Sequence, residues 1–146
     1  MCGIVGYIGK DQALPVLMNG LRRMEYRGYD SAGVALLGAG KTTVVKRSGK
    51  IANLAAALGE HKHASHTGIG HTRWATHGAP TELNAHPHQA GHITIVHNGI
   101  IENYVELKAA LAATGAPFGR SGEHTSELPS LNNLVCRPLL EKKQHP

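Results

Sequence analysis

The sequence predicts an α+β fold in which antiparallel strand pairs alternate with short helices. Residues 3–9 (GIVGYIG) form a short apolar run typical of a buried strand, and residues 92–97 (HITIVH) alternate like a half-buried strand. Residues 11–25 instead carry apolar side chains at helical spacing. The chain has 146 residues, 41% hydrophobic and 4% aromatic, so it suits one domain, or part of a larger one, with an aliphatic core.

Two helices are expected in the first half of the chain. The first covers residues 11–25, with Asp11 as its N-terminal cap and Pro15 tolerated in its first turn. Its apolar face consists of Leu14, Leu17, Met18, Leu21 and Met24. The second helix covers residues 51–58 and ends at Gly59.

Three further strands are expected, and one of them leads into an unusual loop. Residues 32–37 and 42–47 are separated by Gly-Ala-Gly-Lys, which predicts a hairpin. Residues 68–73 (GIGHTR) form a strand that runs into a loop over 74–91, rich in His, Pro, Thr and Asn. A loop of this length usually carries function.

The last part of the chain divides into an ordered and an unpatterned segment. Asn98 and Gly99 form a dipeptide that often marks a hairpin turn, but a helical pattern over 102–113 follows it instead of a strand. Residues 120–146 show neither a strand nor a helix period. We therefore assign residues 1–119 to a partial domain and expect 120–146 to be a non-native or disordered tail.

Charge and cysteine usage exclude several classes of protein. The net charge is +5, but before the tail basic residues are adjacent only at Arg22–Arg23 and Lys46–Arg47, which favours a solvated surface over a nucleic-acid partner. The two cysteines lie far apart, so they form no disulfide framework. No signal peptide or apolar run of about 20 residues is visible, and we expect a cytoplasmic protein without a membrane partner.

The chain also holds 11 histidines, some in pairs that suit zinc. The pairs are His61/His63, His86/His88 and His92/His97. Because no cysteine or carboxylate pattern completes a site around them, we expect no metal and no other cofactor.

Cys2 is the strongest candidate for chemistry. Removal of Met1, which aminopeptidases carry out before small residues, makes Cys2 the N-terminal residue. The residue then holds a nucleophilic thiol and, in its α-amino group with a reference pKa of about 7.7–8.0, a base. The alternative is a cysteine that merely stands second.

Three other positions supply what amide hydrolysis by a thiol needs. Asn98 and Gly99 follow a strand, where a side-chain amide and a backbone N–H suit a developing oxyanion. Arg73 offers a planar fork for a carboxylate, and Trp74 a pocket wall. Taken singly, each has an ordinary alternative: a tight turn, a surface ion pair, or a core side chain.

Four sequence blocks match a known family. They are CGIVG from residue 2, LRRMEYRGYDSAG from 21, TGIGHTRWATHGAPTELNAHPH from 67 and VHNGIIEN from 96. Over about residues 2–118 the chain resembles the class II, N-terminal-nucleophile glutamine amidotransferases. The last three blocks are similar to the branch that transfers ammonia to fructose-6-phosphate.

The resemblance implies a fold and a reaction. The family fold is a four-layer αββα sandwich, of which this chain supplies about the first half. Cys2 would attack the side-chain amide of L-glutamine, form a glutamyl thioester and release ammonia for glucosamine-6-phosphate in hexosamine biosynthesis. Fructose-6-phosphate would bind only to an isomerase domain outside this chain, and the parent enzyme would be a homo-oligomer.

The resemblance also assigns individual residues. It implies that Asn98 and Gly99 form the oxyanion hole. It implies that the substrate pocket is lined by Arg73, Trp74, Thr76 and His77. Arg27 and Gly28 would help to position Cys2.

One departure from the family bears on activity. Where the family carries an Asp that holds the substrate ammonium, residues 121–127 contain none. A charged group without its partner binds weakly, so we expect the chain by itself to be inactive. Two alternatives stay open: the glutaminase domain of another class II amidotransferase, and a non-catalytic truncated chain that binds glutamine.

Overall fold

The computed structural model describes residues 1–59, 63–75 and 79–115, and these fall into two units. The first unit runs from Met1 to Asn98, and the second begins at Gly99. The assignment of residues 120–146 to a tail lies outside the described residues.

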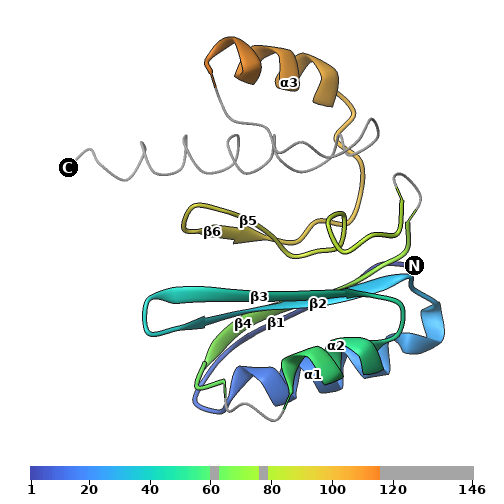
Figure 1. Ribbon diagram of the computed structural model, residues 1–146, viewed down its shortest axis with the longest axis vertical. Helices are drawn as coiled ribbons and strands as arrows, with labels where there is room; N and C mark the ends of the chain where they lie inside the picture. Colours follow the sequence, from blue (N-terminus) through green and yellow to red (C-terminus); the bar gives the residue numbers. More distant parts are fainter. Residues whose placement is uncertain (60–62, 76–78, 116–146) are drawn as a thin grey trace. The chain divides into compact units, whose positions relative to one another are not determined.

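The first unit is built on an antiparallel four-stranded sheet with the order β1-β4-β2-β3 (Figure 1). The strands are β1 (Gly3–Ile8), β2 (Ser31–Gly38), β3 (Lys41–Ser48) and β4 (Thr67–Arg73). β4 pairs with β1 on one side, where Gly3 lies opposite Thr72, and with β2 on the other, where Ser31 lies opposite Arg73. The predicted hairpin of β2 and β3 is confirmed.

Two helices cover one face of this sheet (Figure 1). They are α1 (Ala13–Arg23) and α2 (Ile51–Leu58), both at the predicted places. The buried aliphatic core between helices and sheet is Ala13, Leu17, Met18, Leu21, Ala32, Val34, Leu36, Ile51, Leu54 and Leu58. Gly68 of β4 allows α1 to pack closely, because a Cβ there would lie 2.8 Å from Leu17 Cδ1.

The start of α1 differs from the prediction. Asp11 is not the cap: the N-cap position is Gln12, and no side chain bonds the first turn. The Ala13 N–H instead donates to the Ser65 carbonyl at 2.7 Å. The entry of α1 is therefore fixed by the backbone of the segment before β4, which sequence spacing does not reveal.

The other face of the sheet is covered by the segment that leads into a small hairpin (Figure 1). This hairpin is β5 (His88–Ala90) paired with β6 (Ile93–Ile95). A Cβ on Gly33 of β2 would lie 2.2 Å from the His86 carbonyl oxygen, so the two backbones are in direct contact. The prediction of one loop over 74–91 is thus wrong at residues 88–90, which form β5. The strand predicted over 92–97 is shorter than expected, because residues 91–92 form the turn of the hairpin and only 93–95 pair with β5.

The described part of the second unit contains α3 (Tyr104–Ala113), which confirms the helix predicted over 102–113. Its C-cap is Thr114, and the Gly115 N–H donates to the Ala112 carbonyl at 3.0 Å, so the helix ends where the sequence predicts.

The α+β class is therefore confirmed, and the described residues cover part of a layered domain. β1 and β3 are the edges of the four-stranded sheet. On β1, Ile4 is 45% exposed and Ile8 is 83% exposed. An apolar edge strand of this kind agrees with a sheet that covers only part of a larger fold.

Candidate active site

The candidate nucleophile lies at the end of β4. Because Gly3 pairs with Thr72, the residue before β1 lies beside the residues that end β4. The Trp74 N–H donates to Cys2 Sγ at 3.2 Å, and Cys2 Sγ lies 3.7 Å from the Trp74 carbonyl oxygen. The register of two strands thus places the thiol next to the HTRW run.

The turn at Arg27 and Gly28 receives the N-terminus. The Met1 ammonium donates to the carbonyl oxygens of Arg27 and Gly28, each at 3.3 Å. The φ of Gly28 is +74°, and a Cβ there would lie 2.4 Å from Trp74 Cζ3. Two features of this position require glycine: its positive φ, and the indole ring of Trp74, which leaves no room for a side chain.

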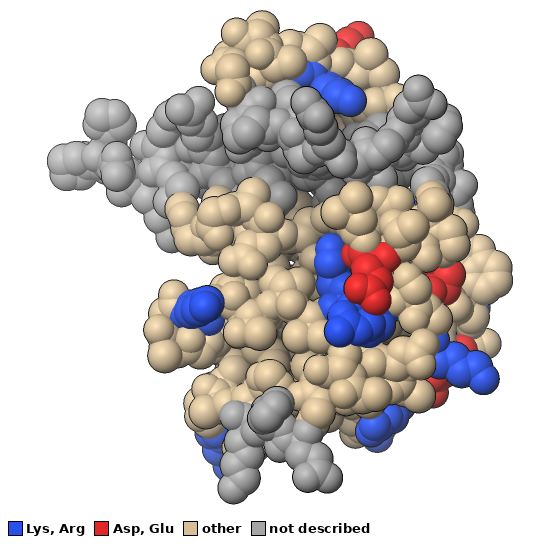
Figure 2. Space-filling model, in the orientation of Figure 1, with Lys and Arg blue, Asp and Glu red and all other residues tan. Residues whose placement is uncertain are grey.

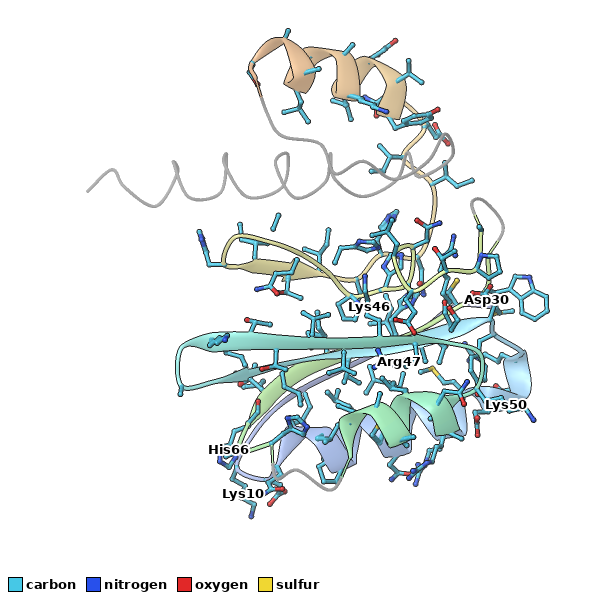
Figure 3. All side chains as sticks on the ribbon, viewed as in Figure 1. Lys10, Asp30, Lys46, Arg47, Lys50 and His66 are labelled. Carbon is cyan, nitrogen blue, oxygen red and sulfur yellow. The ribbon has the colours of Figure 1, made fainter. Side chains whose placement is uncertain are left out.

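Asp30 joins the strands at this end of the sheet, which is opposite to the end where His66 precedes β4 (Figure 3). Its backbone N–H donates to the Arg73 carbonyl at 2.7 Å, and its carbonyl accepts from Gly49 N–H at 2.6 Å. Its carboxylate accepts from Ser31 Oγ at 2.9 Å and from the Ala75 N–H. Asp30 therefore fixes the backbone on both sides of Trp74.

Arg73, the last residue of β4, is buried. It is 8% exposed, and its Nη1 donates to the Ala79 carbonyl at 3.2 Å. That bond ties the loop after β4 back to the strand. A guanidinium in so little water interacts strongly with an anion, which is the property that a carboxylate clamp needs.

Asn98 is held by a histidine that sequence reasoning did not select. His71 Nε2 lies 2.6 Å from Asn98 Oδ1, and His71 is 1% exposed. His71 and Arg73 are two residues apart on β4, so both belong to one face of the strand. The end of β4 therefore contacts one candidate oxyanion donor through His71, and the residue that follows the strand, Trp74, contacts the candidate nucleophile.

Three histidines form a cluster around this contact, and of these His71 and His86 are buried and His88 is half-buried. The His71 and His86 rings stack at 4.3 Å between centroids, and the His86 and His88 rings meet edge to face at 4.8 Å. The pKa of His71 is lowered to about 4, mainly by burial; the hydrogen bond to Asn98 and the nearby backbone of His97 oppose the shift, and the positive charge of Arg73 adds to it. Burial likewise lowers the pKa of His88 to about 4, with Lys46 as the next cause.

His86 shows the largest shift of the three. Its pKa is lowered to about 2, first by burial and then by the nearby charges of His71, His88, Arg73 and Lys46. All three rings are therefore neutral at pH 7, and a neutral ring has one N–H donor and one acceptor nitrogen.

The structure brings together some of the predicted site residues. Cys2, Arg73 and Trp74 meet at the end of β4 with the turn at Arg27 and Gly28, and Asn98 is bound to the same strand. Gly99 belongs to the second unit; its φ of +134° is one that favours glycine. Thr76 and His77 lie outside the described residues.

Two residues of this site were not predicted, His71 and Asp30. Both stand inside the matched sequence blocks, but nothing in their spacing marks them. His71 has a role only because residue 98 returns to β4 from 27 positions away.

Comparison with known proteins identifies the family. A glutamine–fructose-6-phosphate aminotransferase [isomerizing] of Streptomyces coelicolor is 61% identical over 146 residues, covering 97% of this chain and 24% of the relative. The enzyme of the same name from Symbiobacterium thermophilum is 58% identical over 133 residues, covering 90% of this chain and 22% of the relative. The chain belongs to the class II glutamine amidotransferases.

Solved structures agree with this membership. The glutamine phosphoribosylpyrophosphate amidotransferase from B. subtilis, complexed with ADP and GMP, matches 92% of this chain and 32% of its own, with a TM-score of 0.67 and 25% identity. An allosteric regulatory enzyme of purine biosynthesis matches with a TM-score of 0.70, also at 25% identity. No protein-family model matches the chain. The amidotransferase chain spans less than a quarter of the length of the two aminotransferases it matches.

Two further findings concern partners. Within residues 1–59, 63–75 and 79–115, no group of three potential ligands is placed to hold a metal ion, and no helix is long and apolar enough to span a membrane. On the face that Figure 2 shows, Lys and Arg side chains are dispersed, and one group lies beside acidic side chains. Arg47 pairs with Glu82, Nη1 to Oε2, at 3.5 Å.

The contact between Gly28 and Trp74 can be tested with a matched pair of substitutions. Gly28 and Gly40 have the same φ of +74°, but a Cβ on Gly40 meets nothing within 4 Å. Both Gly28→Ala and Gly40→Ala introduce strain of about 1–3 kcal/mol. We expect Gly28→Ala to lose more stability in urea unfolding, and it alone to shift the fluorescence of Trp74, the single tryptophan. Equal losses with unchanged emission would contradict the contact.

The histidine cluster predicts a pH dependence of stability. Because burial holds the pKa values of His71 and His88 at about 4, below the ordinary 6.5, the unfolded chain binds protons that the folded chain does not. Their contribution is complete above pH 6.5 and is lost as the pH falls toward 4. Each histidine adds a slope of up to about 1.4 kcal/mol per pH unit. Urea unfolding between pH 7 and 5 measures it, and His88→Phe should flatten the curve; a flat wild-type curve would refute the prediction.

Proposed function

We propose that this chain is the glutaminase part of a glutamine–fructose-6-phosphate aminotransferase, which releases ammonia from the side chain of L-glutamine. The observation that carries the proposal is the hydrogen bond from the Trp74 N–H to Cys2 Sγ. It holds the thiol of residue 2 against the backbone that directly follows Arg73, within a chain 58–61% identical to enzymes of that name.

The first half of the reaction forms a thioester. The Cys2 thiol gives its proton to the α-amino group that removal of Met1 exposes, and Sγ bonds to the amide carbon of glutamine. The carbonyl electron pair moves to oxygen. When the pair returns, the carbon–nitrogen bond breaks, and the Cys2 ammonium gives a proton to the departing nitrogen. The products of this half are ammonia and a glutamyl thioester.

The second half regenerates the enzyme. Water attacks the thioester while the Cys2 amine accepts its proton, and the carbon–sulfur bond then breaks. Sγ takes the proton back, and glutamate leaves. The sum is glutamine and water giving glutamate and ammonia, so no cofactor is required.

The oxyanion of both steps needs donors. Asn98 would supply its side-chain amide and Gly99 its backbone N–H, and a single such donor is worth about 3–4 kcal/mol of transition-state stabilisation in known enzymes. Support comes from the position of Asn98, whose side chain is hydrogen-bonded to His71 of β4, the strand that ends beside Cys2.

The remaining residues would bind the substrate and place the nucleophile. Arg73 would hold the α-carboxylate of glutamine, with Trp74, Thr76 and His77 around it. The carbonyls of Arg27 and Gly28 accept the Met1 ammonium, so this turn suits a cationic amino group at the N-terminus. Arg27 and Gly28 would therefore help to position the Cys2 amine after processing.

The proposal includes the enzyme around this chain. Ammonia would pass to an isomerase domain that binds fructose-6-phosphate and yields glucosamine-6-phosphate, in a cytoplasmic homo-oligomer. Residues 121–127 lack the family's Asp for the substrate ammonium, so we expect the chain alone to bind glutamine weakly and to turn over little. Residues 120–146 are proposed to be a non-native or disordered tail, as the sequence predicts.

A second candidate is the glutaminase domain of another class II amidotransferase. The structural match to a phosphoribosylpyrophosphate amidotransferase favours it, but at 25% identity. The identity of 61% to an aminotransferase is the stronger observation.

Covalent labelling tests the proposed chemistry without requiring turnover. A diazo-ketone analogue of glutamine should alkylate Cys2 in the chain that has lost Met1, with release of N₂, and millimolar glutamine should protect the thiol. Cys136 serves as an internal reference thiol. Arg73→Lys keeps the charge but loses the bidentate fork, so labelling should weaken by about tenfold, or 1.4 kcal/mol.

Peptide mass spectrometry measures the modified fraction of each cysteine. If Cys2 reacts no faster than Cys136 and glutamine gives no protection, the chain has no glutaminase site.

A further inference from the structure

We propose that His71 is a positioning residue for the oxyanion hole: its Nε2–H donates to Asn98 Oδ1 and leaves the Asn98 NH₂ group as the donor for a substrate oxygen. The proposal rests on the function proposed above for Asn98. It adds a residue that holds the donor and does not itself touch substrate.

The contact is short and dry. His71 Nε2 and Asn98 Oδ1 are 2.6 Å apart, and His71 is 1% exposed. A hydrogen bond at this depth meets little competition from water. It therefore fixes the orientation of the amide plane.

The direction of the bond follows from the other ring nitrogen. His71 Nδ1 is buried and makes no hydrogen bond of ordinary distance and angle within residues 1–59, 63–75 and 79–115, although the backbone of His97 lies near enough to raise the pKa of the ring. If the single proton of the neutral ring were on Nδ1, a buried N–H would be left without an acceptor of ordinary geometry, which is rarer in proteins than an unpaired acceptor. The proton therefore belongs on Nε2, and Asn98 presents its oxygen to the ring.

This direction decides which end of the amide is free. An Asn side chain has an oxygen that only accepts and an NH₂ group that only donates. Because His71 takes the oxygen, the NH₂ group stays available. An oxyanion needs donors, so the opposite orientation of Asn98 would present the wrong group to the reacting carbonyl.

The ring itself is held from two sides. It stacks on His86 with an interplanar angle of 21°, and it belongs to β4, which ends at Arg73 and is followed by Trp74, the residue that contacts Cys2. The His97 N–H donates to His86 Nδ1 at 3.2 Å, which anchors the residue before Asn98 to the same stack. His71 thus links the donor to the strand that holds the nucleophile.

The bond can be measured on the full chain without any activity. Nitrogen-15 chemical shifts of the histidine rings distinguish a protonated from an unprotonated nitrogen. We expect His71 to carry its proton on Nε2, and Asn98→Ala to move that resonance. A proton on Nδ1, or no change in Asn98→Ala, would overturn the proposal.

Its effect on the oxyanion can be measured with the γ-aldehyde analogue of glutamine, which adds to the Cys2 thiol and places an oxygen where the oxyanion forms. His71→Phe should weaken aldehyde binding about tenfold to a hundredfold, less than the 10²–10³ typical for loss of a donor itself. Alkylation of Cys2 by iodoacetamide, which needs no oxyanion hole, should not change. His71→Gln, whose amide also donates, should restore most of the binding.

A double-mutant cycle separates positioning from general stability. In an Asn98→Ala background, His71→Phe should have no further effect, whereas a purely structural role would give the same loss in both backgrounds. His66→Phe, which removes a histidine bonded to the Asp11 carbonyl, is the matched control and should leave aldehyde binding unchanged. If the wild-type chain does not bind the aldehyde, the proposed function fails, and the nitrogen shifts alone decide the His71–Asn98 bond.

Discussion

The antiparallel pairing of β4 with both β1 and β2 is the constraint on which this structure depends. The pairs Gly3–Thr72 and Ser31–Arg73 bring the N-terminus and the start of β2 to the same end of one strand. A shift by one residue would turn every side chain of β4 to the other face, so the buried core against α1 also fixes the register of the site. The thiol position follows from the packing of the fold.

The strand register sets the approximate positions of the site residues, and local hydrogen bonds and packing contacts fix these positions more closely. Asp30 bonds the backbone before and after Trp74, through its N–H to Arg73 and through its carboxylate to Ala75. Gly28 lets the indole ring lie against the turn that also accepts the N-terminal ammonium. On the other side, His71 ties Asn98 to the same strand. The positions of Cys2 and of the candidate donor Asn98 are thus both set by β4, and a fixed geometry of this kind favours catalysis by positioning.

The sequence predicts the elements well and the connections poorly. Both helices of the first unit follow from periodicity, because each buries one apolar face, and β4 and the hairpin of β2 and β3 lie where the sequence predicts them. Asp11 fails as a cap because a backbone carbonyl of Ser65, distant in sequence, takes that role. The site residues came from matched blocks and from the chemistry of an N-terminal Cys. His71 and Asp30 were missed, since their roles exist only once distant segments meet.

A structure of the processed chain bearing the diazo-ketone adduct tests the account most directly. We expect a carbon–sulfur bond at Cys2, the adduct carbonyl oxygen within hydrogen-bond distance of Asn98 Nδ2, and the adduct carboxylate on the Arg73 guanidinium. An adduct on Cys2 whose carbonyl faces solvent, or whose carboxylate lies away from Arg73, would contradict it. The thiol would then be reactive for reasons other than an organised glutaminase site.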